Sequence, residues 1–263
     1  LHSVEDGANY EGYVKYDCFN WAMKKKEEGL IRHFGFSFHG TPELLDKILS
    51  EHPEVEIVQI QMNYADWENP LVQSGRLYEV LRKYNMPFLV MEPVKGGSLA
   101  SASPEVEAEM KKIKPDASVA SWALRFAASL PGVATVLSGM SNEEQMNDNL
   151  KTFTNFEPLS EEERKVIEKA QEELKKNPTV PCTSCRYCCD GCPQQISIPD
   201  VFRALNTIRL YGEKDRAQSY YEKLTQTSGK AGDCIQCGQC ESVCPQHLSI
   251  ISLLEEAAEK LEK

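Results

Sequence analysis

The sequence predicts an α/β protein in which a parallel sheet of about four strand–helix units precedes a smaller, mainly helical region. Apolar segments with strand and helix periodicity alternate along residues 1–155. Nine of the ten cysteines lie beyond residue 181. A chain of 263 residues is long enough for one large domain and one small domain.

The first strand–helix unit begins at a short apolar run, Ile31–Ser37, which is typical of a strand. Thr41 and Pro42 then predict the start of a helix, as its N-cap and its first residue. The apolar positions that follow keep helical spacing: Leu44, Leu45, Ile48 and Leu49.

Three further units continue this alternation. The predicted strands are Val55–Tyr64, Pro87–Met91 and Val133–Leu137. The predicted helices are Ser74–Tyr84, Ala117–Ser129 and Asn142–Thr152. Strands that alternate with helices in this way form a parallel sheet with crossover helices.

A helical connector is expected over residues 156–181, where Ser160 and Glu163 make a capping box for a charged helix that ends near Lys176. Beyond it we expect a helical domain over residues 182–263. Its predicted helices are Pro199–Tyr211, Asp215–Gln226 and Ser249–Leu261.

Composition excludes some classes of function. The hydrophobic content of 41% and the charged content of 26% are ordinary for a globular protein. A net charge of −11 argues against a nucleic-acid-binding surface, which is basic. No stretch approaches the roughly 20 apolar residues of a membrane helix, so we expect no membrane span.

Two cysteine runs share the spacing C-x2-C-x2-C-x3-C-P, which is typical of proteins that bind a pair of 4Fe–4S clusters. The cysteine before the proline then ligates the other cluster. We therefore predict one cluster on the first cysteine set, Cys182, Cys185, Cys188 and Cys244. The second cysteine set, Cys234, Cys237, Cys240 and Cys192, would hold the other. Such clusters carry electrons, and they indicate a reducing, cytoplasmic location.

Zinc and disulfides fit the cysteine pattern less well. Zinc prefers two C-x2-C pairs, and disulfide frameworks belong to small secreted domains, whereas most of this chain is poor in cysteine. One ligand is open, because a C-x2-C-x3-C-x2-C spacing through Cys189 also fits the first run. The symmetry between the two runs favours Cys188 over Cys189.

Residues 1–155 resemble the aldo–keto reductases. The segments that carry the resemblance are Ile31–Ser37, Gln59–Tyr64, Met91–Leu99 and Val136–Gly139, in this order. The resemblance implies a partial (β/α)8 TIM barrel, its second half, followed by a dicluster ferredoxin domain.

The resemblance places Leu1-His2 at the end of the fourth barrel strand, and His2 would assist proton transfer at the substrate oxygen. The family's aspartate, tyrosine and lysine would then lie upstream of residue 1. This chain alone is therefore expected to be inactive in the family reaction. It is either a fragment or a protein that has lost half a barrel, and a fragment is favoured because a half-barrel leaves an unpaired edge strand.

The resemblance also implies a nicotinamide site. Ser37 and Gln61 match carboxamide contacts, although Phe38 and Met91 depart from the family pattern. The other candidate cofactor-binding residues would face the pyrophosphate and the adenosine end: Gly96, Gly97, Gly139, Asp148 and Asn149. Residues 138–149 contain no Lys or Arg for a 2′-phosphate, so NAD(H) is favoured over NADP(H), unless Lys151 or an upstream Lys or Arg supplies the cation.

The predicted function is that of an iron–sulfur oxidoreductase of the aldo–keto reductase type. A carbonyl or alcohol substrate would react in the barrel, and a redox partner such as a ferredoxin or a flavoprotein would exchange electrons with the clusters. One alternative is an electron-transfer module in which the barrel remnant is only a scaffold. Another is that the clusters serve structure or redox sensing.

Overall fold

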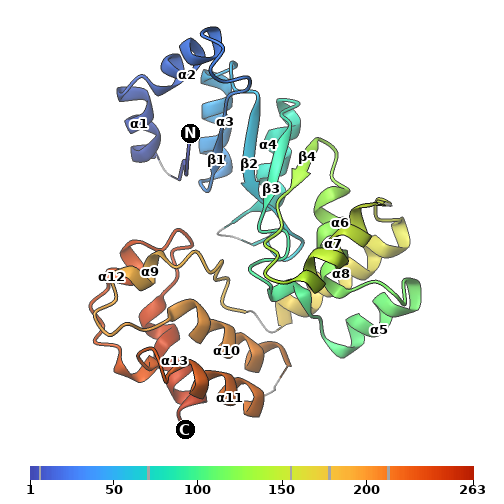
Figure 1. The fold of residues 1–263 in the computed structure, drawn as a ribbon, viewed down its shortest axis with the longest axis vertical. Coiled ribbons are helices and arrows are strands. Elements are labelled where there is room, and N and C mark those ends of the chain that lie inside the picture. The colour runs from blue at the N-terminus through green and yellow to red at the C-terminus, as the bar shows by residue number, and fades with distance from the viewer. Residues whose placement is uncertain (6, 70–71, 155, 177–178, 212–213) are drawn as a thin grey trace. The chain divides into compact units, whose positions relative to one another are not determined.

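The computed structural model describes residues 1–263 except 6, 70–71, 155, 177–178 and 212–213. By its contacts the chain divides into two compact units (Figure 1). The first unit comprises Leu1–Ala100 and Met110–Ile167. The second comprises Ser101–Glu109 and Glu168–Lys263.

The first unit is built on a sheet of four parallel strands, which lie in their order along the chain. These are β1 (Gly35–Phe38), β2 (Ile57–Gln61), β3 (Phe88–Met91) and β4 (Val133–Val136). Because each strand lies beside the next in parallel, every connection crosses back over the sheet. The predicted parallel sheet of four strand–helix units is confirmed.

Helices follow each strand: α3 (Pro42–Glu51), α4 (Ser74–Lys83), α5 (Pro104–Ile113), α6 (Val119–Ala128) and α7 (Glu143–Thr154). A short 3-10 helix, η1 (Ser98–Ala100), precedes α5. The predicted cap of α3 is present, since Thr41 Oγ1 accepts a hydrogen bond from the Leu44 amide at 3.3 Å. Ser118 caps α6 in the same way, through the Ser121 amide at 3.0 Å.

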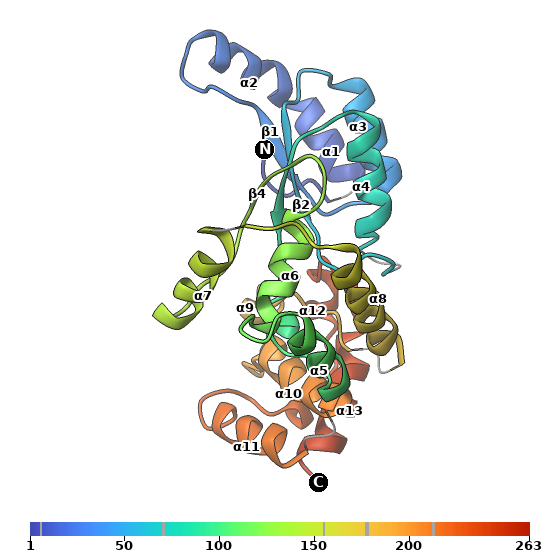
Figure 2. The same cartoon turned by 90° about the vertical axis from the view of Figure 1, so that its right-hand side faces the viewer.

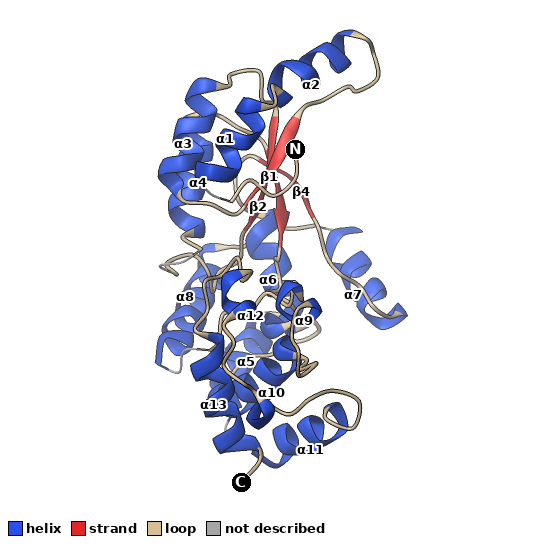
Figure 3. Ribbon diagram, turned by 90° about the vertical axis from the view of Figure 1, so that its left-hand side faces the viewer, coloured by secondary structure: helices blue, strands red, loops and turns tan. Residues whose placement is uncertain are grey.

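One face of the sheet carries the apolar core of this unit. Six alternating side chains on it are at most 3% exposed: Phe36, Phe38, Val58, Ile60, Phe88 and Val90. Figures 2 and 3 both show α3 and α4 on one side of the sheet, and Tyr78 of α4 meets Phe88 edge-on at 5.9 Å. On the opposite face Gln59 and Met91 are half-buried, whereas Ser37 and Gln61 are buried.

Two helices before β1 were not predicted, α1 (Gly7–Lys15) and α2 (Cys18–Glu27). They bury few side chains, so their apolar periodicity is weak. The first residues of the chain run along β1. Val4 forms a parallel bridge with Phe38, and its amide donates to the Ser37 carbonyl at 2.8 Å.

The described part of the second unit is helical (Figure 3). Its helices are α9 (Tyr187–Asp190), α10 (Ile198–Tyr211), α11 (Lys214–Leu224), α12 (Gln239–Ser242), α13 (Ile250–Leu261) and the 3-10 helix η2 (Ala231–Asp233). Helix α8 (Glu161–Lys176) begins in the first unit, and the Ser160–Glu163 capping box predicted for it is present. The core of the second unit includes Phe202, Leu205 and Leu254.

No helix in the described parts of the chain is both long enough and apolar enough to cross a membrane.

Candidate functional site

The two cysteine runs fold into the same local structure twice. Cys188 and Cys240 are each the second residue of a four-residue helix, α9 and α12. The residue before each helix is left-handed, with φ of 68° at Arg186 and 75° at Gly238. Both cysteines are 8% exposed. The repeat in the sequence is therefore a repeat in the backbone and in the burial of its third cysteine.

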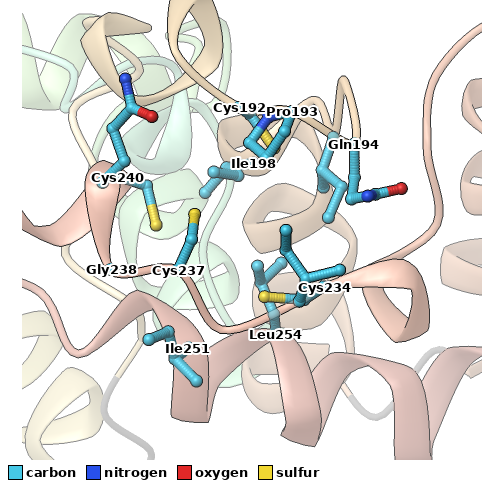
Figure 4. Close-up of a pocket in the computed structure, with 13 residues that line it drawn as sticks. Cys192, Pro193, Gln194, Ile198, Cys234, Cys237, Gly238, Cys240, Ile251 and Leu254 are labelled. Atoms are coloured by element: carbon cyan, nitrogen blue, oxygen red, sulfur yellow. The ribbon is translucent and has the colours of Figure 1, made fainter.

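The second cysteine set surrounds one pocket in the second unit (Figure 4). Cys192, from the first run, lines this pocket together with the three leading cysteines of the second run, Cys234, Cys237 and Cys240. Figure 4 shows the sulfur atoms of Cys237 and Cys240 pointing toward one another. The remaining lining is mainly apolar, with Ile198, Ile251 and Leu254 from α10 and α13. The four cysteines of the predicted second set therefore line one pocket.

The first cysteine set also gathers residues from both runs. The thiol of Cys182 interacts with Cys185 and, from the other run, with Cys244. Burial raises the pKa of Cys182 to about 11, and burial raises that of Cys240 to about 11 as well. Because a thiolate is the metal ligand, these buried thiols need a cation such as iron to lose their protons.

Cys189 lies beside this set in a different role. It exchanges a hydrogen bond with the Cys188 thiol, and this bond lowers the pKa of Cys189 to about 7. Its sulfur also accepts a hydrogen bond from the Ile198 amide. In the repeat Cys189 occupies the position of Glu241, whereas Cys188 occupies that of Cys240. The geometry therefore supports Cys188 as the ligand.

The residues present fit an iron–sulfur cluster. Ile235 lies on the rim of the pocket with 59% of its surface exposed, where a bound cluster would cover it. Backbone amides also face the sulfurs, with Ser184 donating to Cys182 and Glu241 to Cys240. Among the described residues no three His, Cys, Asp or Glu side chains converge on a single ion. In a 4Fe–4S cluster each thiolate binds a different iron atom, so the four cysteines need not converge on one ion. The relevant observation is that the four cysteines line the same pocket.

The residues predicted to contact a nicotinamide ring lie on neighbouring strands. Ser37 of β1 is in register with Gln59 of β2, and Gln61 with Met91 of β3. Ser37 Oγ accepts a hydrogen bond from the Ser3 amide at 2.7 Å. Gln61 is 3% exposed, and its Nε2 donates to a buried carboxylate at 2.9 Å. Both side chains are thus engaged within the protein.

That carboxylate belongs to Asp66, which forms a buried ion pair that the sequence patterns did not predict. Asp66 is 0% exposed and Lys95 is 3% exposed, and the Lys95 ammonium contacts Asp66 Oδ1. Asn63 Nδ2 donates to Asp66 Oδ2 at 2.7 Å. A sequence signal for this pair does exist. Asp66 follows β2 and Lys95 follows β3, and the carboxyl ends of neighbouring parallel strands lie side by side.

The loop after β3 carries the glycines predicted to approach a pyrophosphate. Gly96 and Gly97 have φ of 59° and 92°, a region that glycine enters at little cost. The Gly96 amide donates to the Glu92 carboxylate, and the Gly97 amide donates to the Val94 carbonyl at 3.1 Å. Burial raises the pKa of Glu92. Both amides are used within the loop, and the adjacent carboxylate opposes an anionic ligand.

The predicted adenosine-end residues lie on α7 and just before it. Asn149 Nδ2 donates to Ser138 Oγ at 2.9 Å, and Asp148 accepts a hydrogen bond from Ser118. Asp148 also lines a cavity of about 330 Å³ between α6 and α7. Gly139 is not among the residues that line this cavity.

His2, the predicted catalytic residue, is exposed beside β1. Its backbone carbonyl accepts a hydrogen bond from the Tyr13 hydroxyl. The structure thus places His2 at the edge of the sheet, next to the segment in which Val4 pairs with Phe38.

Comparison with known proteins agrees with this architecture. The aldo/keto reductase family matches residues 17–172, and the 4Fe-4S dicluster domain matches residues 181–249. The chain is 26% identical over 162 residues to the uncharacterized oxidoreductase YqkF of Bacillus subtilis, a match that covers 54% of this chain and 51% of that protein. The chain therefore spans about half the length of this relative.

The second unit has relatives of its own. The chain is 29% identical over 79 residues to the acetyl-CoA decarbonylase/synthase complex subunit alpha 1 of Methanosarcina acetivorans, a match that covers 30% of this chain and 8% of that protein.

Among solved structures, the aldo-keto reductase AKR11C1 from Bacillus halodurans matches with a TM-score of 0.49 and 22% identity, over 65% of this chain and 57% of that one. From the family match over more than half of its length, this chain belongs to the aldo/keto reductase family, and it carries a 4Fe-4S dicluster domain behind the reductase region.

Proposed function

We propose that this chain is the electron-transferring part of an iron–sulfur oxidoreductase, with one 4Fe–4S cluster on each cysteine set. The observation that carries the proposal is the pocket that Cys192 shares with Cys234, Cys237 and Cys240. Four thiols from two distant segments meet there around an apolar volume, which suits a cluster that receives its fourth ligand from the other run.

The reductase region would supply the two-electron chemistry. Oxidation of an alcohol to a carbonyl releases a hydride and a proton, so a two-electron carrier such as a flavin would have to accept the hydride and pass its electrons on singly, and each cluster would take up one of them. Two clusters therefore match one turnover, and a ferredoxin or a flavoprotein would remove or supply the electrons singly. We place this chemistry in the cytoplasm, because the clusters require a reducing compartment.

A nicotinamide site is the weaker component of this proposal. Ser37 and Gln61 lie on the neighbouring strands β1 and β2, but their side chains are already bonded within the protein. The amides of Gly96 and Gly97 are likewise engaged, and Glu92 adds a negative charge. These contacts favour a second candidate function, in which the clusters transfer electrons and the reductase region is a scaffold for them.

One anaerobic experiment separates the two candidates. The chain is reconstituted with iron and sulfide, and its visible cluster absorption is followed during titration with NADH, NADPH and then dithionite. Bleaching by dithionite is expected for both candidates, and a chain that binds no cluster would refute both. Bleaching by NADH supports a nicotinamide-linked reductase, whereas bleaching by dithionite alone shows that this chain does not pass electrons from a nicotinamide to its clusters. The Cys192→Ala variant is the control, since it should lose part of the dithionite signal.

A further inference from the structure

The two cluster sites differ in chemistry although their backbones repeat. The residue after the leading cysteine is Thr183 in the first run and Ile235 in the second. Ile235 lines the pocket of the second cysteine set, whereas Thr183 is 9% exposed. A threonine hydroxyl can donate a hydrogen bond to a sulfur atom, and an isoleucine side chain cannot. The first site is therefore the more polar at this position.

A fixed negative charge marks the second site. Glu241 follows Cys240 directly and interacts with its thiol, and the Glu241 Oε1 atom is held by the Ile251 amide at 2.8 Å. The equivalent residue of the first run is Cys189, whose sulfur accepts the Ile198 amide. One site thus has a carboxylate where the other has a thiol.

A cation near the first site is largely neutralised. Arg186 lies close to Cys189, but its guanidinium pairs with Asp200 at 2.7 Å. Gly238, its equivalent in the second run, carries no charge. The first run also has a carboxylate, Asp190, where the second run has Ser242, but Asp190 is exposed, whereas Glu241 is half-buried and held by the Ile251 amide. Beside the carboxylate of Glu241, the differences that remain are the hydroxyl of Thr183 in the first run and the apolar side chain of Ile235 in the second.

We propose that the two clusters form a redox gradient, in which the cluster on the second cysteine set has the lower reduction potential. This inference rests on the proposed function. Reduction adds one negative charge to a cluster, so a nearby carboxylate and an apolar lining disfavour it, whereas hydrogen bonds to sulfur favour it. A reduced cluster on the second set then gives one electron to an oxidised cluster on the first, and no bond or proton changes place.

The test is a potentiometric titration of the reconstituted full chain, followed by EPR. Two one-electron waves are expected, separated by at least tenfold in the reduction equilibrium constant, which is about 59 mV for one electron. Glu241→Gln and Ile235→Thr should each raise the lower wave and leave the upper one in place. Thr183→Ile should lower the upper wave alone. Glu222→Gln on α11 is the matched control, because it removes an equal charge from an exposed position outside the pocket.

Iron analysis accompanies every variant, and about eight iron atoms per chain mark two intact clusters. Two intact clusters with a single shared potential would overturn the gradient and leave the proposed function standing. A shift of the upper wave by Glu241→Gln would overturn it as well. Uptake of fewer than two clusters by the unmodified chain would refute the proposed function together with the gradient. If Glu241→Gln loses iron, Ile235→Thr and Thr183→Ile still test the gradient, because each is expected to shift one wave and leave the other in place.

Discussion

Lys95 and Asp66 form a buried ion pair that ties the loop after β3 to the segment after β2. The Asp66 carboxylate also accepts hydrogen bonds from Gln61 at 2.9 Å and from Asn63 at 2.7 Å. Both ends of the pair are out of water, so each depends on the other for its charge. The ends of β2 and β3 are therefore joined by this ion pair and its hydrogen bonds as well as by the backbone pairing of the sheet.

Removing the cation of this pair should destabilise the protein. Lys95→Met leaves the Asp66 carboxylate buried without its counter-ion, and we expect a loss of about 3–5 kcal/mol in the free energy of unfolding. Urea unfolding followed by circular dichroism measures it. Lys83→Met is the control, because its pair with Asp46 is 60% and 40% exposed and is screened by water, so its loss should destabilise the protein much less. Equal effects of the two variants would contradict the finding.

Glu92 should make stability fall as pH rises. Burial raises its pKa in the folded state above its usual value of 4.5, so the folded protein favours the neutral carboxyl. Its contribution is full below pH 4.5 and is lost as pH rises through the folded pKa. Glu92→Gln should then be more stable than the wild type near neutral pH, with the difference shrinking toward pH 4.5. Unfolding at several pH values measures this, and a difference independent of pH would argue against it.

The same substitution tests the predicted pyrophosphate contact of the loop after β3. Glu92→Gln removes a negative charge beside Gly96 while keeping an oxygen that accepts the Gly96 amide. If a pyrophosphate binds this loop, the variant should bind NADH more tightly than the wild type, as measured by isothermal titration calorimetry. Unchanged binding, or none to either protein, would point to the scaffold.

The crossing of the fourth ligands can be read from paired substitutions. Cys192→Ala with Cys237→Ala removes two ligands of the second cysteine set, so one complete cluster site remains. Cys192→Ala with Cys185→Ala damages both sets, so neither site is complete. We expect the first pair to retain about four iron atoms per chain and the second pair almost none. The reverse order would show that Cys192 serves its own run, and equal iron in the two would contradict the crossing.

The choice between Cys188 and Cys189 has its own test. Cys189→Ser should keep two clusters, since Cys188 shares the burial and helical position of Cys240. Cys188→Ser should lose the cluster of the first cysteine set. Iron content and EPR spin count, measured on both variants under the same conditions, decide the question. Loss of iron only in Cys189→Ser would assign the ligand to Cys189 instead.

Gly35 should resist substitution because β1 and β2 meet closely there. A Cβ atom at this position would lie 2.0 Å from the Ile57 carbonyl oxygen, so Gly35→Ala should push the two strands apart and destabilise the first unit. Gly12 in α1 has nothing within 4 Å of its Cβ position. Gly12→Ala should therefore stabilise the protein by roughly 0.5–1 kcal/mol. Thermal unfolding of the two variants, compared with the wild type, measures both effects.

Much of the fold could be predicted from local patterns. Val55–Tyr64 was predicted as a strand and contains β2, and Ala117–Ser129 was predicted as a helix and contains α6. Their apolar periodicity is strong because each packs against the core. Helices α1 and α2 were missed for the opposite reason, since α1 buries only Tyr10 and α2 only Phe19 and Ala22.

The parallel α/β sheet, the two cysteine runs and the family can be predicted from local patterns, because periodicity, spacing and motif order are properties of neighbouring residues. Which side chains are already bonded to one another became clear only from the folded chain. Asp66 pairs with Lys95 and accepts a hydrogen bond from Gln61, and the Gly96 amide donates to the Glu92 carboxylate. These contacts join strand ends and loop positions whose distances depend on strand register and on the path of each loop, and the local sequence specifies neither.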